Sequence, residues 1–218
     1  FTHDIYAISI AEFTGLPVIS VNYRLAPENA YPSALDDCHF VLQWVIDHGS
    51  IFDFDASRII IGGDSAGGNL AAALALKMRD ENRTDVIYQY LIFPCLDTDF
   101  ETDSYLHNKN DPFLSREQMI GFWNDYLRGK LNTEDYLALP QRCHDLSGLP
   151  PAYILAADLD PLRDDALHYG KKMGRAGVPV TVRNVEGAIH GFVRARFFSN
   201  VVEKEILNLA SAIRQSIE

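Results

Sequence analysis

The sequence predicts an α/β fold, built on a mostly parallel, doubly wound sheet with helices on both faces. The first observation is an alternation along the chain, in which short apolar runs take turns with stretches of helical period. The second is the β-branched run at residues 59–61, which passes through a glycine-rich turn into the strong helix formers of residues 70–77. The third is size, because 218 residues with 47% hydrophobic side chains suffice for one core.

The first quarter of the chain predicts a helix, a strand, a loop and a second helix. Residues 2–13 fit a helix that Gly15 ends, and residues 16–23 are strand-like. Residues 24–28 leave that strand as a loop, and Pro32 suits the first turn of the next helix. The apolar residues that give this helix its period are Ala34, Leu35, Cys38, Val41, Leu42, Val45 and Ile46.

Four further strands are expected in the rest of the chain, which makes five in all. Helices alternate with them, so we expect the strands to run parallel and the helices to cover both faces of the sheet. The last strand is expected at an edge, where unpaired backbone groups invite a second chain. The strands are residues 59–61, 86–93, 151–157 and 178–183, and the helices are residues 70–77, 119–127, 162–175 and 202–213.

The segment 96–129 interrupts this alternation of strands and helices. Polar and tyrosine residues dominate its first half without a clear period, and Ser115 with Gln118 then forms a capping box before an aromatic-rich helix that Gly129 ends. We expect this insertion to lie over a site as a lid. The alternative is a surface helix that packs on the body of the domain.

The turn after residues 59–61 has the pattern G-x-S-x-G, centred on Ser65. Strand, sharp turn and helix form the context of a nucleophile elbow, in which a strained backbone holds the serine hydroxyl clear of its neighbours. Gly63 and Gly67 would let strand and helix approach without Cβ clashes. The N–H of Ala66, at the helix start, is placed to stabilise an oxyanion. The alternative is a glycine-rich turn with an incidental serine.

A serine nucleophile needs a base, and His190 is the best placed of the seven histidines. It lies in a short, glycine-flanked loop after the last strand, at the carboxyl edge that also holds the elbow. Asp160 follows the preceding strand and would orient the imidazole, with Asp158 as its nearest rival. The resulting order, Ser65, Asp160, His190, is nucleophile, acid, base.

Five segments together resemble one family. They are Gly-Asp-Ser-Ala-Gly-Gly-Asn at 63–69, Tyr-Arg-Leu-Ala-Pro-Glu at 23–28, Leu-Ser-Gly-Leu-Pro-Pro at 146–151, Asp-Pro-Leu-Arg-Asp at 160–164 and His-Gly-Phe at 190–192. The sequence is similar to the hormone-sensitive lipase family of esterases, in its GDSAG subgroup. The resemblance spans nearly the whole chain and implies an α/β-hydrolase fold.

This resemblance implies that residues 1–218 are a catalytic domain in which Ser65 is the nucleophile, Asp160 the acid and His190 the base. It implies that the insertion, about 96–129, is part of a cap that shapes an acyl pocket. The residues expected to bind substrate there are Phe113, Leu114, Leu162, Ile189 and Phe192.

One family motif is absent. Relatives carry an HGGG segment whose N–H groups supply most of the oxyanion hole, and this sequence has none. Residues 2–4 resemble the helix start that follows the motif, so the chain is expected to begin just downstream and the domain to be N-terminally incomplete. Ala66 is then the only identifiable oxyanion donor, and we expect the segment alone to be weakly active or inactive.

The function that follows is a carboxylic ester hydrolase for short- to medium-chain acyl or aryl esters, working through an acyl-enzyme. The same residues could hydrolyse amides. A receptor for small molecules on the same scaffold, without catalysis, is the alternative from another class. The filled nucleophile, acid and base positions favour catalysis.

Composition limits the partners. A net charge of −11 without a basic cluster argues against nucleic acid, and no apolar run is long enough for a membrane span. No spacing suggests a metal or other cofactor. Three widely spaced cysteines are typical of a reducing, cytoplasmic setting. We expect a small ester as substrate and a homodimer through the last strand.

Overall fold

The computed structural model describes residues 4–218 and contains, within them, one parallel sheet of four strands in the order β1-β2-β3-β4. Each strand therefore pairs with its neighbour in sequence. The strands are β1 (Ile59–Asp64), β2 (Val86–Ile92), β3 (Ala152–Ala157) and β4 (Val180–Val185). The carboxyl ends of all four strands consequently meet at one edge of the sheet.

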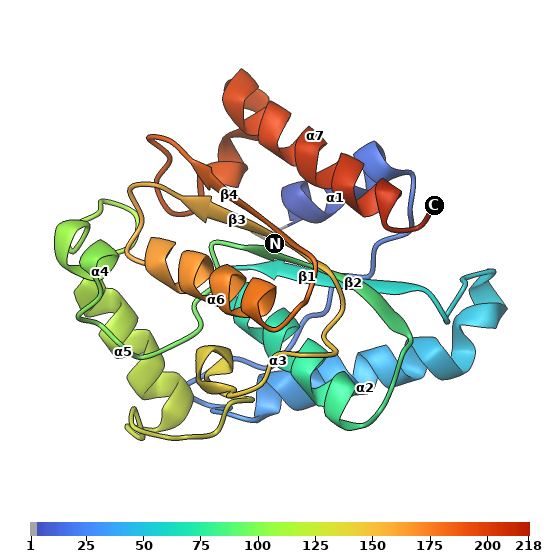
Figure 1. Ribbon diagram of the computed structural model, residues 1–218, viewed down its shortest axis with the longest axis horizontal. Helices are drawn as coiled ribbons and strands as arrows, with labels where there is room; N and C mark the ends of the chain where they lie inside the picture. The colour runs from blue at the N-terminus through green and yellow to red at the C-terminus, as the bar shows by residue number, and fades with distance from the viewer. Residues whose placement is uncertain (1–3) are drawn as a thin grey trace.

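Helices cover both faces of the sheet, as predicted (Figure 1). One face packs against a cluster that includes Leu76, Ile154 and Tyr169, and the other packs against a cluster that includes Ile92, Leu155 and Leu209. The first face carries α2 (Ser33–His48), α3 (Ala66–Asp80) and α6 (Arg163–Arg175), and the second carries α1 (Asp4–Thr14), η3 (Phe192–Phe198) and α7 (Asn200–Gln215).

The burial of the strands follows their place in the sheet. All six residues of β3 are buried, because β3 has strands on both sides and helices above and below it. Most residues of β4 are exposed, and β4 forms an edge of the described sheet. The prediction that the last strand lies at an edge is therefore confirmed.

The insertion forms a small apolar cluster of its own. It contains α4 (Asp103–His107), which was not predicted, and α5 (Arg116–Leu127), whose capping box between Ser115 and Gln118 is present. Figure 1 shows both helices beside the ends of the strands. The buried residues of this cluster are Cys95, Tyr105, Leu114, Met119, Trp123, Leu127, Ala138, Leu139 and Leu162.

The strand predicted at residues 16–23 is wrong. The structure describes this segment without regular secondary structure, and no strand of residues 4–218 pairs with it. A β-prone sequence becomes a strand only when a neighbour accepts and donates its backbone hydrogen bonds. The predicted helix start at Thr2 and His3 lies outside the described residues.

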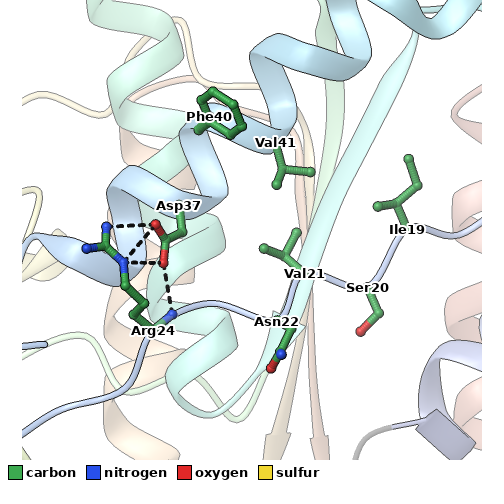
Figure 2. A pocket seen from close by; sticks show the side chains of 8 residues that line it. All are labelled: Ile19, Ser20, Val21, Asn22, Arg24, Asp37, Phe40 and Val41. Carbon is green, nitrogen blue, oxygen red and sulfur yellow. Dashed lines mark hydrogen bonds and ion pairs between the residues drawn. The ribbon is translucent and has the colours of Figure 1, made fainter. Parts of the chain in front are cut away.

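Instead, this segment lines an open groove of about 400 Å³ against α2. Figure 2 shows Ile19 and Val21 on one side and Phe40 on the other. At one end, the guanidinium of Arg24 forms an ion pair with Asp37 at 2.8 Å. Arg24 therefore has the structural role of joining the loop to α2.

Candidate active site

The turn that carries Ser65 is strained. Ser65 has φ 54° and ψ −116°, a backbone region that L-residues rarely adopt. Such a residue costs on the order of 1–3 kcal/mol and persists where the surroundings hold it. Here the Ser65 N–H donates to the carbonyl of Ile92 at 2.9 Å, and the Ser65 carbonyl accepts from Asn69 N–H at 3.1 Å. The predicted elbow geometry is present.

Two glycines, Gly63 and Gly68, make this turn possible, and only Gly63 was predicted to do so. A Cβ at Gly63 would lie 2.4 Å from the backbone carbon of Gly67, so strand and helix could not approach as closely. A Cβ at Gly68 would lie 2.8 Å from Pro94. A Cβ at Gly67 would meet nothing within 4 Å. Gly68 therefore has the packing role that the sequence pattern suggested for Gly67.

A continuous hydrogen-bonded chain links the three predicted side chains. Nδ1 of His190 lies 2.7 Å from Oδ2 of Asp160, and Nε2 of His190 lies 3.0 Å from Oγ of Ser65. Asp160 is fully buried and His190 is 7% exposed. A serine hydroxyl, an imidazole and a buried carboxylate in this order can move the serine proton to the imidazole.

Of the two candidate acids, Asp160 is the one that contacts His190. Its other oxygen, Oδ1, accepts from Leu162 N–H at 2.9 Å, which fixes the carboxylate at the start of the helical segment. Asp158 accepts instead from the Asn184 amide at 3.1 Å and from Gly187 N–H at 3.4 Å. Asp158 therefore braces the loop after β4.

The loop that carries His190 is anchored at its far end by Arg196 of η3. The buried guanidinium of Arg196 forms an ion pair with Glu12 at 2.6 Å and donates a hydrogen bond to Oγ of Ser9. It also lies 4.3 Å from the centre of the Phe13 ring. All three partners belong to α1. The first helix and the loop that carries His190 are therefore one packed unit.

Ala66 is the first residue of α3. The first four N–H groups of a helix have no partner within the helix, and the helix dipole concentrates partial positive charge there. The N–H of Ala66, adjacent in sequence to Ser65, is thus suited to bind an oxygen that develops negative charge. Its role as an oxyanion donor remains a prediction.

The five predicted substrate-binding residues fall into four places. Phe113 is half-exposed and covers the loop that carries His190, since a Cβ at Gly191 would lie 2.8 Å from the Phe113 ring. Leu114 and Leu162 are buried together in the insertion cluster. Phe192 packs against Phe93 at 5.8 Å between ring centres. Ile189, which is partly buried, precedes His190 in the loop.

Sequence reasoning missed two carboxylates that hold the segments around the site. Asp165 accepts from Leu96 N–H at 2.7 Å and from Asp97 N–H at 3.3 Å, and Asp164 accepts from Ser104 N–H at 2.8 Å. Burial raises the pKa of Asp165 well above its usual range. Asp164 is the last residue of the motif Asp-Pro-Leu-Arg-Asp and Asp165 follows it, but no sequence signal indicated these contacts.

Asn69 of α3 is a third residue of this kind. Its buried side-chain amide donates to the carbonyls of Cys95 and Ala138, at 2.9 and 3.1 Å. The helix of the elbow is thereby tied to the segment after β2 and to the insertion cluster.

Comparison with known proteins defines the class. The family described as having an alpha/beta hydrolase fold matches residues 1–194. Esterase LipI of Mycobacterium tuberculosis is 39% identical over 194 residues, which cover 88% of this chain and 60% of LipI. Carboxylesterase NlhH of the same organism is 39% identical over 196 residues, which cover 88% of this chain and 61% of NlhH. A solved esterase of Pyrobaculum calidifontis superposes with a TM-score of 0.93 at 33% identity, covering 98% of this chain and 70% of the other.

The chain therefore belongs to the α/β-hydrolase family. Its relatives confirm the resemblance to the hormone-sensitive lipase group of esterases. The chain spans about 60% of the length of these curated relatives. Among residues 4–218, no helix is both long and apolar enough to cross a bilayer.

Proposed function

We propose that this chain provides the nucleophile, base and acid of a serine carboxylic ester hydrolase. The observation that carries the proposal is the hydrogen-bonded chain from Asp160 through His190 to Ser65. Oγ of Ser65 attacks the acyl carbonyl carbon while Nε2 of His190 takes its proton. Asp160 accepts the hydrogen bond from Nδ1 and stabilises the imidazolium that forms.

The rest of the cycle uses the same groups. The tetrahedral intermediate collapses as His190 returns the proton to the leaving alcohol, and an ester bond to Ser65 remains. Water then attacks this acyl-enzyme, His190 takes the water proton and passes it to Ser65, and the carboxylic acid leaves. The N–H of Ala66 stabilises the oxyanion in both halves.

The substrates that we propose are small, uncharged esters with short to medium acyl chains or aryl groups. The insertion supports apolar substrates of this kind, because Phe113 lies beside the loop that carries His190. The next residue, Leu114, belongs to the apolar cluster of the insertion. The domain, as proposed, is an α/β-hydrolase core with segment 96–129 as its cap. Amide hydrolysis by the same groups is a second activity to assay.

Two further proposals concern the assembly and its setting. A homodimer through β4 is supported by the exposed edge that β4 forms in the described sheet. A cytoplasmic setting is supported by Cys38, Cys95 and Cys143, all of which are unpaired.

The test of the hydrolase combines turnover with labelling of the nucleophile. Ser65→Ala should reduce hydrolysis of a short-chain aryl ester by about 10⁴-fold or more, while Ser57→Ala, an exposed control, keeps the wild-type rate. A serine-reactive phosphonate should add its mass to the peptide that contains Ser65. Full activity of a folded Ser65→Ala variant would refute the assignment. Ester binding without turnover or labelling would favour a receptor.

A further inference from the structure

Phe93 has a backbone conformation that its side chain does not favour. It follows β2 with φ 34°, in the left-handed region that glycine adopts most easily and a bulky residue avoids. Its N–H donates to the carbonyl of Leu155 at 2.6 Å, and its side chain is 1% exposed. A phenylalanine where glycine would be less strained suggests that the ring itself has a purpose.

That ring packs on the imidazole of His190. The ring centres lie 4.6 Å apart, and the planes are inclined at 59°. The hydrogen bonds of His190 to Asp160 and Ser65 use its two ring nitrogens. These two hydrogen bonds lie along the ring edge, and the Phe93 ring packed on the imidazole adds a further restraint on its tilt.

The Phe93 ring can also stabilise the charged form of His190 electrostatically. His190 becomes an imidazolium when it takes the serine proton, in a place where it is only 7% exposed and poorly hydrated. A cation within about 6 Å of an aromatic ring centre is attracted by the ring quadrupole when it faces the ring. The 4.6 Å separation meets the distance condition, and fluorination of the ring tests the orientation condition. A buried leucine in place of Phe93 would fill space without this attraction.

We infer that Phe93 is a positioning residue for the base, holding the His190 ring in the plane that joins Asp160 to Ser65 and stabilising its charged form. The inference rests on the proposed function, because it concerns the proton that His190 takes during ester cleavage. It adds to Ser65, His190 and Asp160 a further residue on which the rate of the chemical step depends.

The first experiment compares Phe93→Leu with Tyr153→Leu in steady-state hydrolysis of a short-chain aryl ester. Tyr153 is a buried aromatic residue of the same core cluster and has no ring contact with His190. Phe93→Leu should lower kcat roughly three- to thirtyfold with KM within about twofold. Tyr153→Leu should leave kcat within about twofold of wild type. A folded Phe93→Leu variant with the kcat of wild type would overturn the inference.

The second experiment preserves shape and varies only the charge on the ring face. Phenylalanines with one, two and three ring fluorines at position 93 should lower log kcat progressively, because fluorine withdraws negative charge from the face. Circular dichroism and phosphonate labelling of Ser65 confirm that each protein is folded and competent. A rate independent of fluorination, or one that rises with it, would refute the electrostatic role. Wild type that neither hydrolyses esters nor is labelled at Ser65 by the phosphonate would instead refute the proposed function.

Discussion

The proposed reactive residues depend on backbone shape as much as on side-chain chemistry. Ser65 reaches its place because β1 and α3 force it to a positive φ, and Gly63 supplies the clearance for that approach. His190 is set between Gly187 and Gly191, both of which also have positive φ. Glycine tolerates that region at little steric cost, so the loop can turn the imidazole back toward the serine.

The two glycines of the elbow make a matched pair for testing this dependence. Gly63→Ala should destabilise the fold by about 1–3 kcal/mol, because the new Cβ would lie 2.4 Å from the backbone of Gly67. Gly67→Ala should instead stabilise it by about 0.5–1 kcal/mol, since that Cβ meets open space inside a helix. Urea unfolding of both variants checks the prediction. Equal effects at the two positions would contradict it.

The acid of the site can be tested by a second pair. Asp160→Asn should reduce kcat by about 10⁴-fold, by analogy with serine protease triads, because an amide favours the wrong tautomer of His190. Asp158→Asn should leave kcat within a fewfold, because Asp158 bonds Asn184 and Gly187. Rates are measured on an aryl ester with both proteins folded. A harmless Asp160→Asn beside a damaging Asp158→Asn would reverse the assignment.

At the scale of elements, buried carboxylates join helices to the segments that surround the site. Asp165, on α6, satisfies two N–H groups of the segment after β2, and Glu205, on α7, makes a two-pronged ion pair with Arg183 of β4 at 2.7 Å. Burial and partners act in opposite directions at these two sites. Asp165 has a raised pKa because burial dominates, and Glu205 has a lowered pKa because its hydrogen bonds to Arg183 dominate.

Asp165 should make the fold less stable as the pH rises. A carboxyl group whose pKa is raised by folding stabilises the folded state fully at pH values below its unfolded-state pKa, which is about 3.8. This stabilisation is lost as the pH rises through the folded-state pKa. Asp165→Asn keeps an acceptor for Leu96 and removes the titration. The stability of the variant relative to wild type should therefore increase from about pH 4 upward, as measured by urea unfolding. A difference that is constant with pH would contradict this.

Glu205 should give the stability of the fold a pH dependence of the opposite sign. Its lowered pKa means that its contribution is present above the unfolded value of about 4.5 and is lost as pH falls through the folded-state pKa. Glu205→Gln should cost about 1–2 kcal/mol at neutral pH, with part of the ion pair screened because Arg183 is half-exposed. The cost should shrink in acid. Thermal unfolding between pH 3 and 7 measures it, and a cost that grows in acid would refute the prediction.

At the scale of the molecule, the sheet has two different kinds of strand. β2 and β3 are enclosed by strands and helices, whereas β4 forms an edge with most of its side chains exposed. Such an edge presents unpaired N–H and C=O groups that a second copy of the chain can satisfy.

If β4 joins two copies, a charge on it should separate them. Val182, near the middle of β4 and 38% exposed, is the position to change. The wild-type protein should sediment as a dimer at tens of micromolar, and Val182→Lys should sediment as a monomer, because lysine on an edge opposes pairing. Phe122→Lys, on the exposed face of α5, is the control and should leave the dimer intact. A monomeric wild type would refute the dimer.

The sequence by itself determined the parallel α/β architecture, because helical and strand periods are local properties of the chain. It also placed Ser65 and His190 after predicted strands, because a glycine-containing motif follows each of these strands. Tertiary structure alone decided three matters. Residues 16–23 form no strand because pairing requires a neighbour, Asp160 and not Asp158 reaches His190, and Phe93 lies on the imidazole. Each depends on contacts between segments far apart in sequence, and local pattern carries no information about them.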